Sequence, residues 1–253
     1  MATFKERLTA GETLVGPFIS LDCPDVVEAV GLAGWDFALV DCEHSPLGSD
    51  TVGNIGRACA ATGMNLVVRV PGNEEWLINK ALDAGAEAVV VPQIDGIESA
   101  RRAATSAKYA PRGTRGANPF TRAGRFQGFG GLDFYANANR DTMLILMVEG
   151  VGGANDIHEI ASLENVDALF FGPVDFSHSL GVPGQIDHPK VIETITRLMS
   201  VAREHGKAIG VFANDVQRAR FWMDRGAQFI AFGVDINIIF KAFQGLATEL
   251  KKR

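Results

Sequence analysis

The sequence predicts an α/β fold: a (β/α)8 TIM barrel, in which one domain spans residues 1–253. Short β-rich runs alternate with helix-length segments through the whole chain. Runs such as 89–91 and 144–146 are apolar at every position, which is typical of parallel strands buried on both faces. A chain of 253 residues also has the length that eight βα units require. A doubly wound sheet is the alternative.

The expected strands leave room for one helix between each pair. Four segments repeat a pattern in which a turn after a helix leads into an apolar strand: AGWDFALVD, AGAEAVVVP, NVDALFFGP and RGAQFIAFG. Their spacing is uneven, so the pattern indicates repeated βα units and no solenoid. The expected strands are 13–20, 36–41, 65–70, 88–93, 143–149, 168–172, 208–212 and 229–233.

The longest segment without a clear strand or helix pattern is 109–139. It is rich in glycine and carries an arginine cluster from Arg112 to Arg125. Long loops in a compact domain are usually functional. We expect this segment to be a lid or a contact between subunits.

Composition excludes several classes of partner. The net charge is −6, and the lysines and arginines are scattered along the chain, so we expect neither nucleic acid nor a membrane surface as a partner. The three cysteines show no CxxC spacing, which suggests neither a disulfide framework nor a zinc site. The N-terminus has no apolar targeting segment. We therefore expect a cytoplasmic protein.

Reactive side chains gather where the expected strands end. The second strand runs into VDCEHSP, which places two carboxylates and an imidazole within four residues. Active sites of (β/α)8 barrels lie at this end of the strands, so these side chains are expected to converge on one mouth. The residues are Asp41, Glu43, His44, Arg69, Glu149 and Asp175.

Glu149 and Asp175 follow neighbouring strands, whose axes lie roughly 4.8 Å apart. Both carboxylates can therefore reach one cation, and their oxygen ligands suit a hard divalent ion such as Mg²⁺ or Mn²⁺. The alternative is that each acid only caps the helix that follows it.

His44 and Asp41 form a candidate acid/base pair, because a carboxylate can fix the imidazole tautomer and raise its basicity. A surface histidine is the alternative. Arg69 can clamp a carboxylate or stabilise an oxyanion, or else form a structural ion pair with one of the acids. Three roles are possible for Glu43: it could lie at a helix N-terminus, hold another site residue in place, or be a solvated charge.

Two kinds of chemistry lack support in the sequence. The lysines fall on helical segments, at termini or at strand entrances, so we expect no Schiff-base lysine inside the barrel. Neither a GxGxxG motif nor a Walker loop occurs, and the seventh and eighth strands lead into no glycine-rich phosphate nest, so we expect no nucleotide cofactor.

Over nearly its whole length the chain resembles the metal-dependent class II pyruvate aldolases, typified by 4-hydroxy-2-oxoheptanedioate and 2-keto-3-deoxy sugar acid aldolases. The motifs that carry the resemblance stand in the same order here. They are DCEH (41–44), VVRVP (67–71), DAGAEAVVVP (83–92), YAPRGTRG (109–116), VEG (148–150), GPVDFS (172–177) and FGVD (232–235).

The resemblance implies a barrel of the phosphoenolpyruvate/pyruvate type and a homohexamer. It implies Mg²⁺, Mn²⁺ or Co²⁺ at Glu149 and Asp175, bound to the carboxylate and keto oxygens of a 2-oxo acid. The reaction would be reversible retro-aldol cleavage of a 4-hydroxy-2-oxo acid, through a metal-stabilised enolate, to pyruvate or hydroxypyruvate and an aldehyde.

The resemblance also assigns roles to single residues. Arg69 would support the enolate oxygen, and His44 with Asp41 would move protons. Asp83 would come from a neighbouring subunit. The backbone from Gly172 through Pro173 and Val174 to Asp175 would receive the substrate carboxylate.

This chain departs from the family pattern near the expected metal. Many members have glutamine where this chain has Met147, which cannot donate a hydrogen bond. A usual polar residue is replaced by Gly150. By family position, Phe212 and Val234 line the acceptor side and make it apolar. We therefore expect a donor other than plain pyruvate, such as hydroxypyruvate, to be possible, and short aldehyde acceptors.

Two rival functions remain. Related barrels cleave CoA esters of the malyl-CoA or citramalyl-CoA type, for which the arginine cluster could bind the CoA phosphates. A non-catalytic barrel that binds through the long segment is the second rival.

Overall fold

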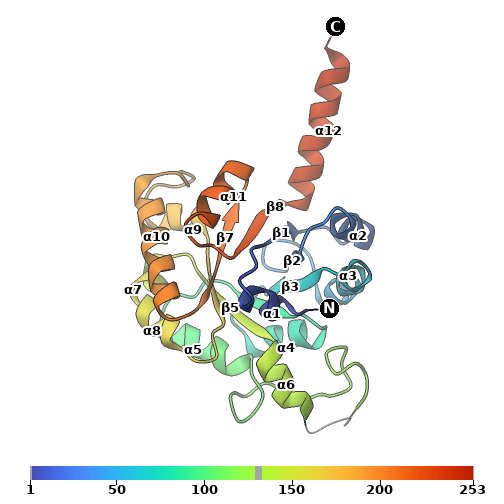
Figure 1. Cartoon of the computed structure of the whole chain (residues 1–253), viewed down its shortest axis with the longest axis vertical. Helices are drawn as coiled ribbons and strands as arrows, with labels where there is room; N and C mark the ends of the chain where they lie inside the picture. Colours follow the sequence, from blue (N-terminus) through green and yellow to red (C-terminus); the bar gives the residue numbers. More distant parts are fainter. Residues whose placement is uncertain (1, 129–132, 253) are drawn as a thin grey trace.

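The computed structural model describes residues 2–128 and 133–252 and contains a closed barrel of parallel strands in the order β1 to β8 (Figure 1). The predicted barrel is confirmed, and the doubly wound sheet is excluded because β1 pairs with β8. The strands are β1 Leu14–Ile19, β2 Phe37–Asp41, β3 Asn65–Arg69, β4 Ala88–Val91, β5 Met143–Val148, β6 Ala168–Phe171, β7 Ala208–Ala213 and β8 Phe229–Val234.

The helices surround the barrel, and α1 closes the end at which the strands begin. Phe4 of α1 places its ring 5.3 Å from that of Phe37 and 5.6 Å from that of Phe229, at the starts of β2 and β8. The helices are α1 Phe4–Thr9, α2 Pro24–Leu32, α3 Ser49–Thr62, α4 Glu75–Asp83, α5 Ile97–Ser106, α6 Asp133–Asp141, α7 Val151–Asn155, α8 Ile157–Ser162, α9 Pro173–Ser179, α10 Pro189–Glu204, α11 Val216–Met223 and α12 Asp235–Lys251.

Side chains alternate along each strand and build two separate cores. Inward side chains fill the barrel with aromatic and aliphatic groups, and outward ones pack beneath the helices. Gly210 makes room for this filling, because a Cβ there would lie 2.1 Å from the Phe229 ring. The barrel is therefore a packed core, and only its upper rim is left for chemistry.

The segment 109–139 differs from the expectation in two ways, although residues 129–132 lie outside the described part. It contains α6 from Asp133 onward. Its loop is tied to the helix ends at the side where the strands begin: Ala123 N–H donates to the Asp83 carbonyl and Thr114 N–H to the Thr105 carbonyl. Within one chain the described part of the segment therefore lies away from the mouth and does not cover it as a lid, while contact between subunits stays a prediction.

Helix α12 leaves the barrel and projects away from it (Figure 1). Its apolar side chains lie largely in solvent, with Phe243 70% and Leu250 86% exposed. Among the described residues, no helix combines the length and apolarity that a membrane crossing requires.

Candidate active site

The mouth of the barrel lies opposite α1 and is lined by inward side chains at the strand ends. Asp41 and Arg69 are register partners at the ends of β2 and β3, and both are buried. Phe18 of β1 and Met147 of β5 complete this wall and are also buried. Continuous apolar strands bring the charged groups here, because the polar residues begin only where each strand leaves the core.

Arg69 is the centre of an ion-pair cluster. Its Nε and Nη2 donate to the two Asp41 carboxylate oxygens at 3.0 and 2.8 Å, a bidentate geometry. Its Nη1 lies 3.2 Å from Glu43 Oε2 and 3.8 Å from the Met147 sulfur. The guanidinium also lies 4.7 Å from the Phe18 ring centroid. The ion pair considered as an alternative role of Arg69 is therefore present, and it fixes the guanidinium at the rim.

The expected pairing of Asp41 with the His44 imidazole does not form. Asp41 Oδ1 accepts the main-chain N–H groups of Glu43 and His44 at 3.1 and 3.2 Å, and both its oxygens bind Arg69. The arginine lies directly beside Asp41 in register and satisfies the carboxylate first. Asp41 therefore shapes the turn that carries His44 and does not contact its ring.

Glu43 is the carboxylate that faces His44. Its Oε2 lies 3.7 Å from His44 Nε2, and its side chain is only 6% exposed, whereas that of His44 is 66% exposed. Glu43 Oε1 accepts from the Gln93 amide at 2.8 Å. Glu43 Oε2 has an ion-pair neighbour but no hydrogen bond within the described structure. Of the three roles left open for Glu43, the structure supports the one that holds other site residues.

Glu149 lies beside this cluster, and its carboxyl group has a raised pKa. The pKa of Glu149 is raised to about 7, chiefly by burial and also by the charges of Asp175 and Glu43, while the Gln93 N–H and Arg69 oppose the shift. Its Oε1 accepts from the Gln93 N–H at 2.8 Å. Asp175 is the third residue of α9 and is exposed. Gly172 caps α9 without a side chain, so Asp175 is not the N-cap that the alternative reading required.

The donor set fits a divalent cation. Glu149 and Asp175 are close enough to repel one another, and Glu149 Oε2 borders Gly172, where a Cβ would lie 3.0 Å from it. Two neighbouring carboxylates that repel one another are stabilised by a cation between them. No cluster of three or more His, Cys, Asp and Glu ligands occurs among the described residues, so water and substrate would supply the remaining positions.

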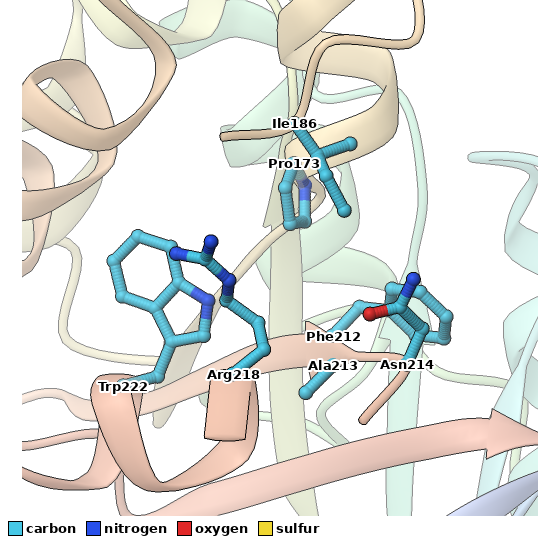
Figure 2. Close-up of a pocket in the computed structure, with 7 residues that line it drawn as sticks. All are labelled: Pro173, Ile186, Phe212, Ala213, Asn214, Arg218 and Trp222. Atoms are coloured by element: carbon cyan, nitrogen blue, oxygen red, sulfur yellow. The ribbon is translucent and has the colours of Figure 1, made fainter. Parts of the chain in front are cut away.

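The remaining expected substrate contacts frame one side of the mouth. Pro173 and Phe212 border a narrow surface depression between α9, the end of β7 and α11. Figure 2 shows Pro173 and Ile186 on the side opposite Arg218 and Trp222. Val174 is 43% exposed at the start of α9, and Val234 ends β8 on the inward side.

Asp83 lies away from the mouth of its own chain. It ends α4, which runs from the end of β3 to the beginning of β4, and its carboxylate binds Arg115 at 2.8 Å. The structure of one chain therefore does not bring Asp83 together with the other site residues.

Gln93 and Phe18 belong to the site but were not predicted from the sequence. Gln93 follows β4 and bonds both Glu149 and Glu43. Its role depends on a positive φ of 54°, for which PQID carries no glycine or asparagine signal. Phe18 is an inward residue near the end of β1, and its only signal in the sequence is an aromatic side chain where an expected strand meets the rim.

Comparison with protein families places the whole barrel in one group. The profile described as HpcH/HpaI aldolase/citrate lyase matches residues 14–242.

Individual relatives match over their full lengths. Hydroxypyruvate/pyruvate aldolase of Roseobacter denitrificans is 34% identical over 251 residues, which cover 99% of this chain and 97% of the relative. 5-Keto-4-deoxy-D-glucarate aldolase of Klebsiella pneumoniae is also 34% identical, covering 98% and 96%. The crystal structure of a HpcH/HpaI aldolase/citrate lyase family protein from Burkholderia cenocepacia superposes with a TM-score of 0.92 at 34% identity, covering 98% of each chain.

Proposed function

The chain belongs to the HpcH/HpaI aldolase/citrate lyase family, and from this premise we propose that it cleaves 4-hydroxy-2-oxo acids to pyruvate or hydroxypyruvate and an aldehyde. It is a carbon–carbon lyase of the class II aldolase type. The observation that carries the proposal is the rim cluster, in which Arg69 and His44 both face Glu43, next to the carboxylate of Glu149.

The residues of the chain can perform the proton transfers of a retro-aldol cleavage. His44 is exposed at the mouth and can take the proton from the C4 hydroxyl, after which the C3–C4 bond breaks and the aldehyde leaves. The Arg69 guanidinium, held at the rim by Asp41, would stabilise negative charge that develops on the enolate oxygen. His44 can then return the proton to the enolate carbon to give the 2-oxo acid.

We propose that Glu149 and Asp175 hold a divalent cation, Mg²⁺, Mn²⁺ or Co²⁺. When bound there, the cation would polarise the 2-oxo group and stabilise charge on its oxygen. Glu149 is supported as a ligand by its burial and by its repulsion from Asp175, which a cation would remove. The backbone from Gly172 to Asp175 begins α9, where main-chain N–H groups can receive the substrate carboxylate.

The surroundings of the site favour small and partly apolar substrates. Met147 lies buried between Arg69 and Gly172, and Phe212 and Val234 add apolar surface on the facing side. We therefore propose short aldehydes as acceptors, and either pyruvate or hydroxypyruvate as the donor.

We propose that the protein assembles as a homohexamer in the cytoplasm. The exposed apolar face of α12 supports self-association, and Asp83 could reach a mouth only from a neighbouring subunit. Cys23, Cys42 and Cys59 are free thiols, which suits a reducing compartment. No nucleic acid or membrane partner is proposed.

The CoA-ester lyase alternative loses its main support. Arg112 binds Asn165 and Glu164, and Arg115 binds Asp83, at the end of the barrel where the strands begin. Within one chain Arg112 and Arg115 therefore lie away from the mouth.

The proposal is tested by pyruvate release from a racemic 4-hydroxy-2-oxo acid, using metal-stripped protein with and without Mn²⁺ or Mg²⁺. We expect release only with metal. Activity that is indifferent to metal would overturn the roles of Glu149 and Asp175. A protein that is silent under every condition would overturn the aldolase proposal, and thioester cleavage would be assayed next.

A further inference from the structure

Gln93 occupies a strained turn after β4. Val91 pairs with Leu146, and Ile94 N–H donates to the Met147 carbonyl at 3.1 Å, so contact with β5 continues on both sides of Gln93. Between these points Gln93 has a φ of 54°, in the left-handed region. A residue with a Cβ is rarely found there, and such strain gathers at functional sites.

This turn directs both hydrogen-bond donors of Gln93 at acidic residues. Its main-chain N–H donates to Glu149 Oε1 at 2.8 Å, and its side-chain Nε2 donates to Glu43 Oε1 at 2.8 Å. Glu43 in turn faces His44 Nε2 and Arg69 Nη1 through its other oxygen. One residue thus links Glu149, which follows β5, to Glu43, which follows β2.

We propose that Gln93 is a positioning residue for aldol cleavage, which holds Glu43 in place between His44 and Arg69. The inference rests on the proposed function. Glu43 is buried, and without the amide its Oε1 would lose the hydrogen bond that fixes the carboxylate. The Gln93 residue is itself exposed, so its side chain is not required to fill the core.

The test compares Gln93→Ala and Gln93→Gly with the wild type and with Gln217→Ala, an exposed glutamine of α11 that serves as the matched control. Both variants at Gln93 retain the main-chain N–H that binds Glu149. We expect kcat to fall at least about tenfold. The KM for the 2-oxo acid and the Mn²⁺ Kd from titration calorimetry should stay within about threefold, because the proposed metal ligands are undisturbed.

Stability gives a readout that does not depend on turnover. Glycine adopts a positive φ without strain, so Gln93→Gly should unfold at the same urea concentration as the wild type or a higher one. A merely structural glutamine would lower that concentration. In a Glu43→Ala background, Gln93→Ala should reduce kcat by less than about twofold further, because the two residues act as a unit.

The outcomes separate the two proposals. An inactive wild type would overturn the aldolase function and this role with it. An active wild type whose kcat stays within about twofold in Gln93→Ala would overturn the positioning role alone. A loss of kcat that follows a loss of stability, or an equal loss in the Glu43→Ala background, would overturn it as well.

Discussion

At the scale of single residues, the rim of the barrel holds charges that depend on one another. Arg69 shares its donors between Asp41 and Glu43, and all three side chains are less than a tenth exposed. Removing one partner of such a group leaves a buried charge without compensation. His44 differs from its neighbours, because its side chain is two-thirds exposed and carries no part of the packing.

His44 should therefore affect turnover without affecting stability. We expect His44→Ala to lower kcat by about 10²- to 10⁴-fold, since general acid/base catalysis contributes this range. The melting temperature should stay within about 1 °C, because the exposed ring is not packed. Pyruvate release and differential scanning calorimetry on the same preparation measure both quantities. Equal activity of variant and wild type would remove His44 from the mechanism.

Glu149 predicts a pH-dependent stability of the metal-stripped protein. Its pKa is 4.5 when unperturbed and about 7 in the fold. Between these values the folded state holds one proton more than the unfolded state, so the free energy of unfolding falls as pH rises and stays lower above pH 7. At about 1.4 kcal/mol per pH unit, the loss reaches about 3 kcal/mol.

Glu149→Gln removes this titration and isolates it from other groups. We expect variant and wild type to have similar urea midpoints at pH 5, and the variant to be more stable at pH 8. Parallel pH profiles for the two proteins would show that Glu149 ionises without strain in the fold.

The sequence was enough to bring Glu149, Arg69 and His44 to one mouth, because the carboxyl ends of all barrel strands meet there. The sequence was not enough to predict which acidic residue faces His44. Asp41 and Glu43 stand two residues apart, and which of them faces His44 depends on strand register and side-chain rotamers. Gln93 could not be found, since its positive φ has no local sequence signal.

At the scale of secondary-structure elements, the strands were predicted well because they are continuous apolar runs. Each observed strand begins or ends within about two residues of its expected range. Helix α6 was missed, because DFYANANRD is short and polar and its packing depends on contacts of Phe134 and Tyr135 with Tyr109, which the sequence pattern does not show. Strands and helices that the core stabilises can be predicted from their apolar pattern. Segments that depend on a few specific side-chain contacts cannot.

Lys108 makes specific polar contacts of this kind. They connect the segment after α5 to the residues that precede β5 and β6. Its Nζ donates to the carbonyls of Asn139 and Thr142 at 3.1 and 2.7 Å and lies 3.4 Å from Asp167 Oδ2, and the residue is 1% exposed. Lys108→Met would leave these acceptors buried without this donor. We expect a loss of about 2–4 kcal/mol in the free energy of unfolding.

Urea denaturation measures this loss, with Lys190→Met as the control. Lys190 is an exposed lysine near the start of α10, and its substitution should change the free energy of unfolding by less than about 0.5 kcal/mol. Equal effects of the two substitutions would show that Lys108 is not a structural tie.

At the scale of the whole molecule, α12 is unlike the other helices around the barrel. It carries an apolar face at helical spacing that the described residues of its own chain leave exposed. The exposed side chains on this face are Ile236, Phe240, Phe243, Leu246 and Leu250. The sequence pattern predicts a helix here, but it does not predict that the helix projects away from the barrel. The described part of this chain supplies no surface that covers the apolar face.

The exposed face of α12 predicts association between copies of the chain, because apolar patches of this kind mark interaction surfaces. We expect the double variant Phe243→Glu with Leu246→Glu to dissociate the assembly, since burying two carboxylates in an apolar contact is unfavourable. Analytical ultracentrifugation measures the change in mass. Thr248→Glu, on the opposite side of the same helix, should leave the mass unchanged.

Dissociation should also reduce activity if a neighbour completes the site. Asp83 lies far from the mouth of its own chain, so a monomer would lack it there, while Arg69, Glu43 and His44 would keep their contacts. We therefore expect the α12 double variant to retain the circular dichroism of the barrel and to lose most of its kcat/KM. A monomer as active as the wild type would show that each barrel carries a complete site, and an unchanged mass would place the contact between subunits elsewhere.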